Sequence, residues 1–198
     1  MKKRQITFNS PVVLSFVFIS FCVMVANYLT AGLSNDLLFV TYHSSLASPM
    51  TYVRFFTHVL GHMGWSHYIN NMMYLLLLGP MLEEKYGSRA IIEVILITGL
   101  MAGLANWLLF PSIGLCGASS VVFAFILMTS FTSFKEGEIP LTVILVAIIF
   151  IGQQVYEGLF VQDNISNMAH IVGGIVGAVA GYTLNKKDEK LSDIQMHR

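Results

Sequence analysis

The chain has 198 residues, of which 55% are hydrophobic and only 11% are charged, and its formal net charge is zero. This composition does not suit a soluble surface, and the lack of net charge gives no electrostatic reason to expect binding to nucleic acid. We therefore expect a membrane protein whose natural solvent is the lipid bilayer.

The N-terminal residues MKKRQ precede a long apolar run, which is a pattern also found in signal peptides. The run from 11 to about 33, however, has roughly the 20 residues that a membrane span requires, which is longer than the apolar part of a signal peptide. It also lacks a convincing small-residue cleavage site. We predict that it is retained as the first membrane helix.

Five further apolar runs of spanning or near-spanning length follow, at about 66–82, 90–110, 117–134, 139–157 and 165–184. The sequence thus predicts an all-α fold, a polytopic bundle of six transmembrane helices. Because no linker is long enough to separate a second domain, we expect one membrane-embedded domain over 1–198 with short terminal tails. The segment 34–66 is too polar to span, and we expect it to lie partly in the membrane interface on the outer side.

Lysine and arginine residues indicate the orientation of the helices. Ten of them lie before the first span, in the loops after the second and fourth spans, or after the sixth: Lys2, Lys3, Arg4, Lys85, Arg89, Lys135, Lys186, Lys187, Lys190 and Arg198. With six spans these residues all share one side, which the positive-inside rule makes cytoplasmic. We expect a multi-pass protein of the cell (inner) membrane with both termini in the cytoplasm.

Polar side chains at membrane depth are costly, so each one needs a reason. Ser119 begins the fourth span and His170 lies one to two turns into the sixth, and both spans enter from the predicted outer side. His67 and Asn71 are four residues apart at the outer start of the second span, so they share one helix face. We expect these four side chains to converge in the outer leaflet, as the residues of a functional site would.

Each of these residues also has a plainer interpretation, since a serine in the sequence GASS is usually a packing or helix-start residue. A single buried histidine, likewise, usually satisfies a nearby carbonyl group. The surroundings of His170 favour a function, because a row of small residues at i, i+4 spacing lets another helix approach closely. This row consists of Ala169, Gly173, Gly177 and Gly181. If the neighbour is the fourth helix, Ser119 comes within hydrogen-bonding distance of His170.

A serine and a histidine are sufficient for nucleophilic catalysis. A serine hydroxyl is a weak nucleophile until a neighbouring base takes its proton, and histidine has a suitable pKa for that exchange. No acidic residue is placed to complete a triad, because Glu157 and Asp163 lie in or near the loop before the sixth span. We therefore expect a dyad of Ser119 and His170.

The polar residues around the second span permit two interpretations. Asn71 and His67 lie at the depth of Ser119, where their side chains and the backbone amides at the start of the fourth span would stabilise an oxyanion. Alternatively, His58, His62 and His67 have the spacing of zinc ligands. The sequence from His58 to His62 lacks the glutamate that a metalloprotease helix places beside its first histidine. We therefore expect no metal and no other cofactor.

These residues, in this order, resemble the rhomboid family of intramembrane serine proteases. The resemblance rests on His62-x4-His67-x3-Asn71, Gly117-Ala118-Ser119, and Ala169-His170 with its glycine row. It covers nearly the whole of a minimal, bacterial-type six-helix core, about residues 50–182. It implies that Ser119 is the nucleophile and His170 the base. Asn71 and His67, together with the backbone of Ser119, would stabilise the oxyanion.

The resemblance also assigns supporting residues to the site. Gly117 precedes the nucleophile, His62 begins the first motif, and Phe123 stands where a tyrosine often packs on the histidine ring. Ser120 occupies the place of a glycine, so two adjacent serines are available. Arg54, in the first loop, looks like one of the structural charged residues of the family.

Family resemblance implies an endopeptidase that cleaves transmembrane segments of single-span or other membrane proteins near their extracytoplasmic end. The alternative is a non-catalytic rhomboid-like protein that binds membrane proteins for quality control. The presence of both Ser119 and His170 favours the enzyme. Glu83 looks like the structural acid at the cytoplasmic end of the second helix, and Cys22 and Cys116 are expected to pack as small hydrophobic residues.

Overall fold

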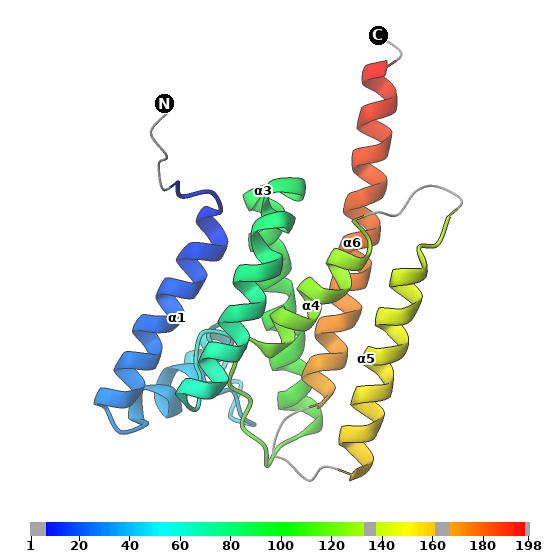
Figure 1. The fold of residues 1–198 in the computed structure, drawn as a ribbon. Helices are drawn as coiled ribbons and strands as arrows, with labels where there is room; N and C mark the ends of the chain where they lie inside the picture. The colour runs from blue at the N-terminus through cyan, green and yellow to red at the C-terminus, as the bar shows by residue number, and fades with distance from the viewer. Residues whose placement is uncertain (1–6, 133–137, 161–166, 197–198) are drawn as a thin grey trace.

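The computed structural model describes residues 7–132, 138–160 and 167–196 (Figure 1). Over these residues every regular element is a helix. In chain order the elements are α1 (Pro11–Leu29), the π-helix η1 (Asn35–Phe39), α2 (Pro49–Thr57), α3 (Trp65–Leu109), α4 (Ser119–Ser130), α5 (Leu141–Phe160) and α6 (Asn167–Met196). The predicted all-α class is confirmed.

Helix α3 is a hairpin of two helical arms. Its 45 residues are interrupted at Gly87, which has φ 83° and ψ 155°. Residues with a side chain rarely adopt this backbone conformation, whereas glycine adopts it readily. The arms 65–86 and 88–109 fold back on one another (Figure 1) and correspond to the predicted spans 66–82 and 90–110. Counted with these two arms, the bundle contains the six predicted helices.

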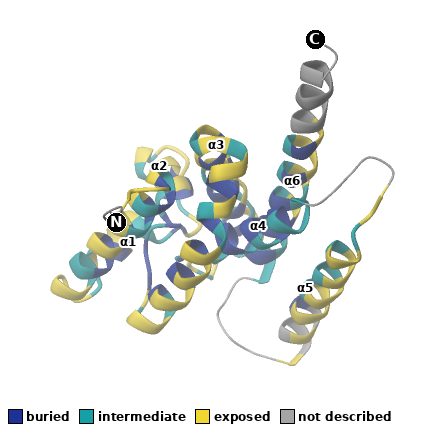
Figure 2. Ribbon diagram, turned by 45° about the horizontal axis from the view of Figure 1, so that its top comes forward, coloured by how far each residue is buried: buried dark blue, intermediate teal, exposed yellow. Residues whose placement is uncertain are grey.

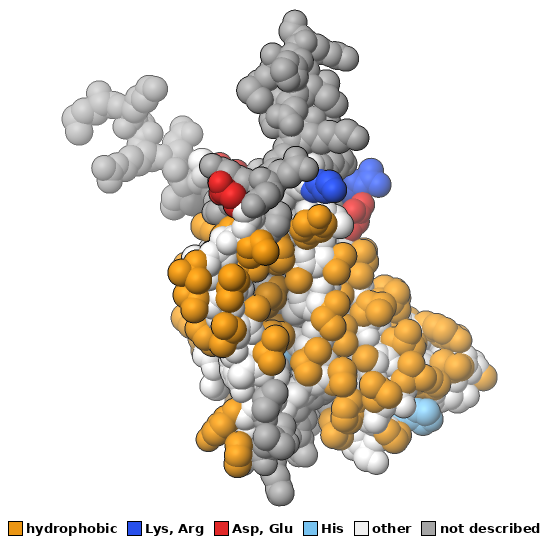
Figure 3. Space-filling model, turned by 90° about the vertical axis from the view of Figure 1, so that its right-hand side faces the viewer, with side chains coloured by type: hydrophobic (Ala, Val, Ile, Leu, Met, Phe, Trp, Pro, Cys, Tyr) orange, Lys and Arg blue, Asp and Glu red, His pale blue; other side chains and the backbone are white. Residues whose placement is uncertain are grey.

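The long helices have the length and composition of membrane spans. Helices α1 and α3 and the part of α6 up to Lys186 are long and apolar enough to cross a bilayer, and the apolar parts of α4 and α5 are shorter. In Figure 3, Lys, Arg, Asp and Glu side chains gather at one end of the visible face, above a broad hydrophobic surface. Such a surface suits a protein surrounded by lipid.

Glu83 joins α3 to the start of α1. Its two carboxylate oxygens accept hydrogen bonds from the backbone amides of Val12 and Val13, each at 3.0 Å, and Ser88 Oγ donates to the same carboxylate at 2.7 Å. The first amides of a helix have no partner within the helix, and a negative charge there is favoured by the helix dipole. This buried acid is therefore paired, and it fixes the N-terminal end of α1 beside the Gly87 turn.

Helix α4 lies at the centre of the bundle and packs closely against α6 (Figure 2). A Cβ atom added to Gly173 would collide with the carbonyl oxygen of Ser120, and one added to Gly177 would collide with that of Ala124. The glycine row thus brings the two backbones into contact, as its spacing predicts. This contact lies beside Ser119 and His170.

The segment between α1 and α3 is bonded to the α3–α4 connection, and hydrogen bonds within the segment stabilise it further. Thr41 and Leu115 exchange two backbone hydrogen bonds, of 3.0 and 2.8 Å, in an isolated antiparallel bridge. Buried Arg54 donates to the carbonyl groups of Leu37 (2.8 and 3.0 Å) and Asp36 (3.3 Å). Arg54 thus makes the structural contacts that the resemblance implied.

Several predicted helix boundaries need correction. The first helix was expected to run to about 33, but α1 ends at Leu29. The fourth helix was expected over 117–134, but α4 covers Ser119–Ser130, and its start is set by Gly117, whose φ of 139° is incompatible with a helix. The sixth was expected to end near 184, but α6 continues to Met196, because helix formation there does not require apolar residues. Helix α1 begins and α6 ends at the same end of the bundle, so α6 begins at the opposite end (Figure 1).

Candidate active site

The structure brings Ser119 and His170 into hydrogen-bonding contact. Ser119 is the first residue of α4, and His170 lies in the first turn of α6. The distance from His170 Nε2 to Ser119 Oγ is 3.1 Å, although the residues are 51 positions apart in the chain. This approach depends on Gly173, which lets α6 contact the α4 backbone at Ser120.

Aromatic rings fix the plane of the His170 imidazole. The ring of Phe123, one turn after Ser119 on α4, lies 4.5 Å from the His170 ring at an angle of 38°. Phe150 of α5 also packs on Phe123, with ring centroids 5.0 Å apart. His170 is only 7% exposed, so its ring has little freedom to turn.

A second hydrogen bond of His170 involves a residue that was not among the predicted site residues. Oε1 of Gln154, on α5, lies 3.2 Å from His170 Nδ1. Gln154 is 5% exposed and stands within the apolar run that predicted the fifth span. A polar residue in such a run requires a reason, and this rule could have identified Gln154 as it did Ser119.

His67 and Gly117 form a close contact at the entrance to α4. A Cβ atom on Gly117 would lie 2.5 Å from Cε1 of the His67 ring, so only glycine leaves room for the imidazole. Asn71 lies one turn further along α3 on the same face. Its amide nitrogen is buried and has no partner among the described residues, so it is an available hydrogen-bond donor.

The His62 ring packs against the His67 ring, and the His62 backbone is bonded to η1. Its ring lies 5.1 Å from that of His67, and its Nδ1–H donates to the carbonyl of Leu60 at 3.2 Å. The His62 carbonyl accepts a 2.9 Å bond from Nδ2 of Asn35 in η1. Burial lowers the pKa of His62 to about 4, so this histidine is neutral at physiological pH.

The two adjacent serines have different surroundings. Ser119 is partly exposed and faces His170, whereas Ser120 is 1% exposed and its Oγ has no partner among the described residues. The carbonyl of Ser120 is turned toward Gly173 of α6. Of the two acids considered for a triad, the side chain of Glu157 and the whole of Asp163 lie outside the described residues.

The histidines proposed as alternative zinc ligands have separate partners. His58 Nε2 donates to the carbonyl of Gly99 at 3.0 Å, and His62 Nδ1 donates to Leu60. Within 7–132, 138–160 and 167–196, no group of three His, Cys, Asp or Glu side chains is arranged to hold a metal ion. Cys22 and Cys116 are both free thiols, and burial raises the pKa of Cys116 to about 12.

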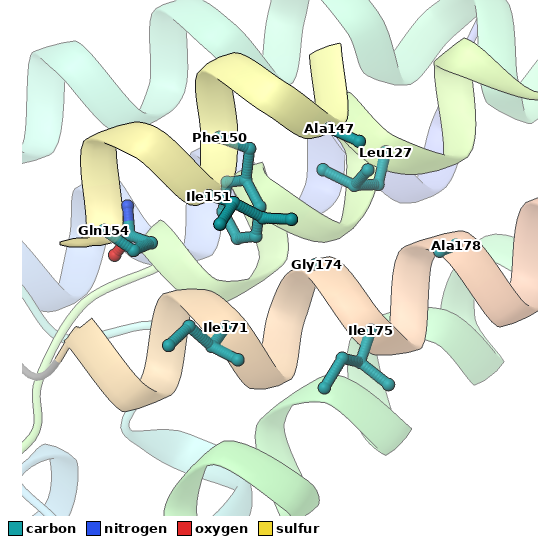
Figure 4. Close-up of a pocket in the computed structure, with 9 residues that line it drawn as sticks. All are labelled: Leu127, Ala147, Phe150, Ile151, Gln154, Ile171, Gly174, Ile175 and Ala178. Carbon is teal, nitrogen blue, oxygen red and sulfur yellow. The ribbon is translucent and has the colours of Figure 1, made fainter. Parts of the chain in front are cut away.

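An apolar pocket adjoins the site between α4, α5 and α6. It has a volume of about 420 Å³ and is lined by Leu127, Ala147, Phe150, Ile151, Gln154, Ile171, Gly174, Ile175 and Ala178 (Figure 4). Gln154 is the one polar side chain among these nine, and it also contacts His170. The pocket wall therefore extends to the histidine.

Comparison with known proteins identifies the family. The model of the Rhomboid domain matches residues 49–187, which is well over half of the chain. The chain belongs to the rhomboid family. This confirms the resemblance inferred from the three motifs, and the polytopic membrane fold of the family agrees with the apolar helical bundle.

Individual relatives are similar over different shares of their length. The chain is 33% identical to Rhomboid-related protein 2 of Mus musculus over 162 residues, which are 70% of this chain and 53% of that protein. It is 25% identical to Rhomboid-like protein 11, chloroplastic, of Arabidopsis thaliana over 67% of this chain and 52% of the relative. Rhomboid protease GlpG of Haemophilus influenzae is 21% identical over 87% of this chain and 91% of its own length. The chain thus spans about half the length of the mouse and Arabidopsis relatives.

Proposed function

We propose that this rhomboid is an intramembrane serine endopeptidase with Ser119 as nucleophile and His170 as general base. The observation that carries the proposal is the 3.1 Å contact between Ser119 Oγ and His170 Nε2, made across two helices inside an apolar bundle. A histidine that accepts the serine proton converts the hydroxyl into an effective nucleophile. The similarity to Rhomboid protease GlpG supports the same activity.

The arrangement suits a two-step acyl transfer. Ser119 Oγ attacks the scissile carbonyl carbon while Nε2 of His170 takes the hydroxyl proton. The tetrahedral intermediate collapses as the C–N bond breaks and His170 returns the proton to the leaving amine. Water then attacks the acyl-serine while His170 takes its proton. The bond between the acyl carbon and Ser119 Oγ breaks as His170 returns that proton to Oγ, which releases the carboxyl product and the free serine hydroxyl.

The site offers several donors for the developing oxyanion. The backbone amide of Ser119 is at the start of α4, where amides have no partner within the helix and the helix dipole favours negative charge. Asn71 offers a buried Nδ2 that has no partner in the described part of the chain, and the His67 ring lies against Gly117, two residues before Ser119. Together these groups would hold the oxyanion in a water-poor site.

The substrate is a transmembrane segment of another membrane protein, cleaved near its extracytoplasmic end. A regular helix hides its carbonyls in hydrogen bonds, so a cleavable segment should carry helix-weakening residues near the cleavage site. His170 lies near the start of α6, at the end of the bundle opposite the Gly87 turn. Lys85 and Arg89 flank that turn, and the positive-inside rule makes that end cytoplasmic. A C-terminal fluorescent or phosphatase reporter fusion tests this orientation.

Co-expression with tagged single-span membrane proteins tests the activity. We expect the wild type to release a shortened fragment, Ser119→Ala to release none, and Ser120→Ala to retain substantial cleavage. The matched serine variants separate the nucleophile from packing effects, because adjacent helical residues point about 100° apart. Substrate capture by the wild type without any cleavage would instead support the non-catalytic binding alternative.

A further inference from the structure

We propose that Gln154 is a positioning residue for His170, so that the reacting unit contains side chains from α4, α6 and α5. This inference rests on the proposed function, because the orientation of His170 matters to catalysis only if it is the base. Nothing in the motifs of the family resemblance includes this glutamine.

The two hydrogen bonds of the His170 ring require one tautomer. For Nε2 to accept the proton of Ser119 Oγ at 3.1 Å, Nε2 must carry the lone pair, and Nδ1 must then carry the hydrogen. Gln154 Oε1, at 3.2 Å from Nδ1, is an acceptor and matches that hydrogen. In Figure 4 the oxygen of Gln154 is on the side of its amide that faces α6. In this orientation the glutamine favours the tautomer that the serine needs.

Burial makes this hydrogen bond decisive for the position of both side chains. His170 is 7% exposed and Gln154 is 5% exposed. Removing an amide from water without a hydrogen bond is costly, and the amide nitrogen of Gln154 has no partner among the described residues. The bond from Nδ1–H is therefore the interaction that holds the amide in place, and it is strengthened by the apolar pocket wall around it.

The packing of α5 brings the glutamine to this position. Phe150 and Gln154 are four residues apart and share one face of α5. The Phe150 ring lies against Gly174 of α6, where an added Cβ would be 2.7 Å from the ring, and it also packs on Phe123. The glycine at 174 thus allows α5 to approach closely enough for Gln154 to reach His170.

An amide can perform this task without a carboxylate. Papain-like proteases use an asparagine as the third member of their Cys–His–Asn group, where it orients the imidazole. Gln154 would act in the same way, by holding the ring and its tautomer, and would not touch the substrate.

Three purified single variants test the proposal: Gln154→Met, Gln154→Glu and, as the matched control, Gln153→Met, which changes the exposed neighbouring residue. We expect Gln154→Met to lower kcat by on the order of 10- to 100-fold with little change in KM, because the base is mispositioned and substrate binding is intact. Gln154→Glu keeps an acceptor oxygen and should restore most of kcat. Gln153→Met should match the wild type.

A spectroscopic readout separates this proposal from the proposed function. In protein with ¹⁵N-labelled histidine, assigned by comparison with His170→Asn, the ring nitrogens of His170 should report the Nδ1–H tautomer in the wild type and a mixture of tautomers in Gln154→Met. An unchanged kcat in Gln154→Met, an equal loss in Gln154→Glu, or identical ring shifts in wild type and Gln154→Met would overturn the positioning role. If the wild type neither cleaves substrate nor labels with a serine probe, the proposed function fails, and the ring shifts alone decide whether Gln154 sets the tautomer.

Discussion

Asn71 has a buried amide nitrogen without a partner among the described residues, and a buried unpaired donor costs about 1–3 kcal/mol. Such a cost is reasonable in an active site if an acceptor arises during the reaction. The oxyanion is such an acceptor, and it is absent from the resting protein. Asn71 is therefore the side chain that best distinguishes the oxyanion interpretation from the metal interpretation.

We predict that Asn71→Ala lowers kcat by on the order of 10² to 10³ and leaves KM nearly unchanged, since it removes a bond made mainly in the transition state. Steady-state cleavage of a purified substrate measures both constants. The exposed neighbour variant Asn70→Ala should behave as wild type. A strong chelator should leave activity intact, and loss of activity with recovery on adding zinc would instead favour the metal site.

For individual residues, the sequence could predict which side chains lie at the same depth in the membrane but not the direction in which each one points. Ser119 and His170 were found because position within a span sets depth, and the small-residue row beside His170 indicated a close neighbour. The position of Gln154 in an apolar run could have marked it as a candidate, but its contact with His170 could not be predicted, because the direction of a side chain on α5 depends on how that helix is rotated against α6. That rotation is fixed by packing of Phe150 on Gly174, which no local pattern reveals.

The contact between α4 and α6 is the element on which the site depends most. Gly177 meets the carbonyl of Ala124 one turn beyond the contact of Gly173 with Ser120. Any side chain at these positions would push the helices apart and separate Ser119 from His170. The backbone cannot move aside as a flexible side chain would, so the substitution is costly.

We predict that Gly177→Ala lowers both thermal stability and activity, with a destabilisation of at least about 1–3 kcal/mol from overpacking. Gly152→Ala on α5 is the matched control, because nothing lies within 4 Å of its added Cβ. Alanine favours a helix over glycine by roughly 0.5–1 kcal/mol, so the control should be neutral or slightly stabilised. Equal melting temperatures for the two variants would contradict the helix-contact account.

Helix number and order could be predicted because each apolar run is long enough to be recognised. Helix boundaries could not be predicted where the backbone conformation of a glycine ends or delays a helix. The end of the first arm of α3 at Gly87 and the late start of α4 after Gly117 both follow from positive φ angles, and at Gly117 the His67 ring leaves no room for a side chain. The extension of α6 to Met196 was missed because hydropathy marks membrane spans and gives no sign of a polar helical continuation.

For the whole molecule, the first loop links stability to pH through two buried histidines. Burial lowers the pKa of both His58 and His62 to about 4, from an ordinary value near 6.5. The unfolded chain therefore binds more protons than the folded protein between these pH values. Their contribution to stability is present in full above about 6.5 and is lost as the pH falls toward about 4.

We predict that the thermal midpoint of the purified protein falls steadily between pH 6.5 and pH 4.5. The dependence should be shallower in His62→Gln, which removes one of the two titrating groups and keeps a side chain that can donate to the carbonyl of Leu60. Midpoints that do not change over this range in the wild type would mean that these histidines are not buried in the neutral form.

The central claim is that Ser119, activated by His170, is the nucleophile of this rhomboid. The most direct measurement is to react the folded, membrane-reconstituted protein with a fluorophosphonate and to locate the adduct by mass spectrometry of its peptides. We predict an adduct on Ser119 that is absent in Ser119→Ala, strongly reduced in His170→Asn and retained in Ser120→Ala. An adduct on Ser120, or none on protein shown to be folded, would contradict the account.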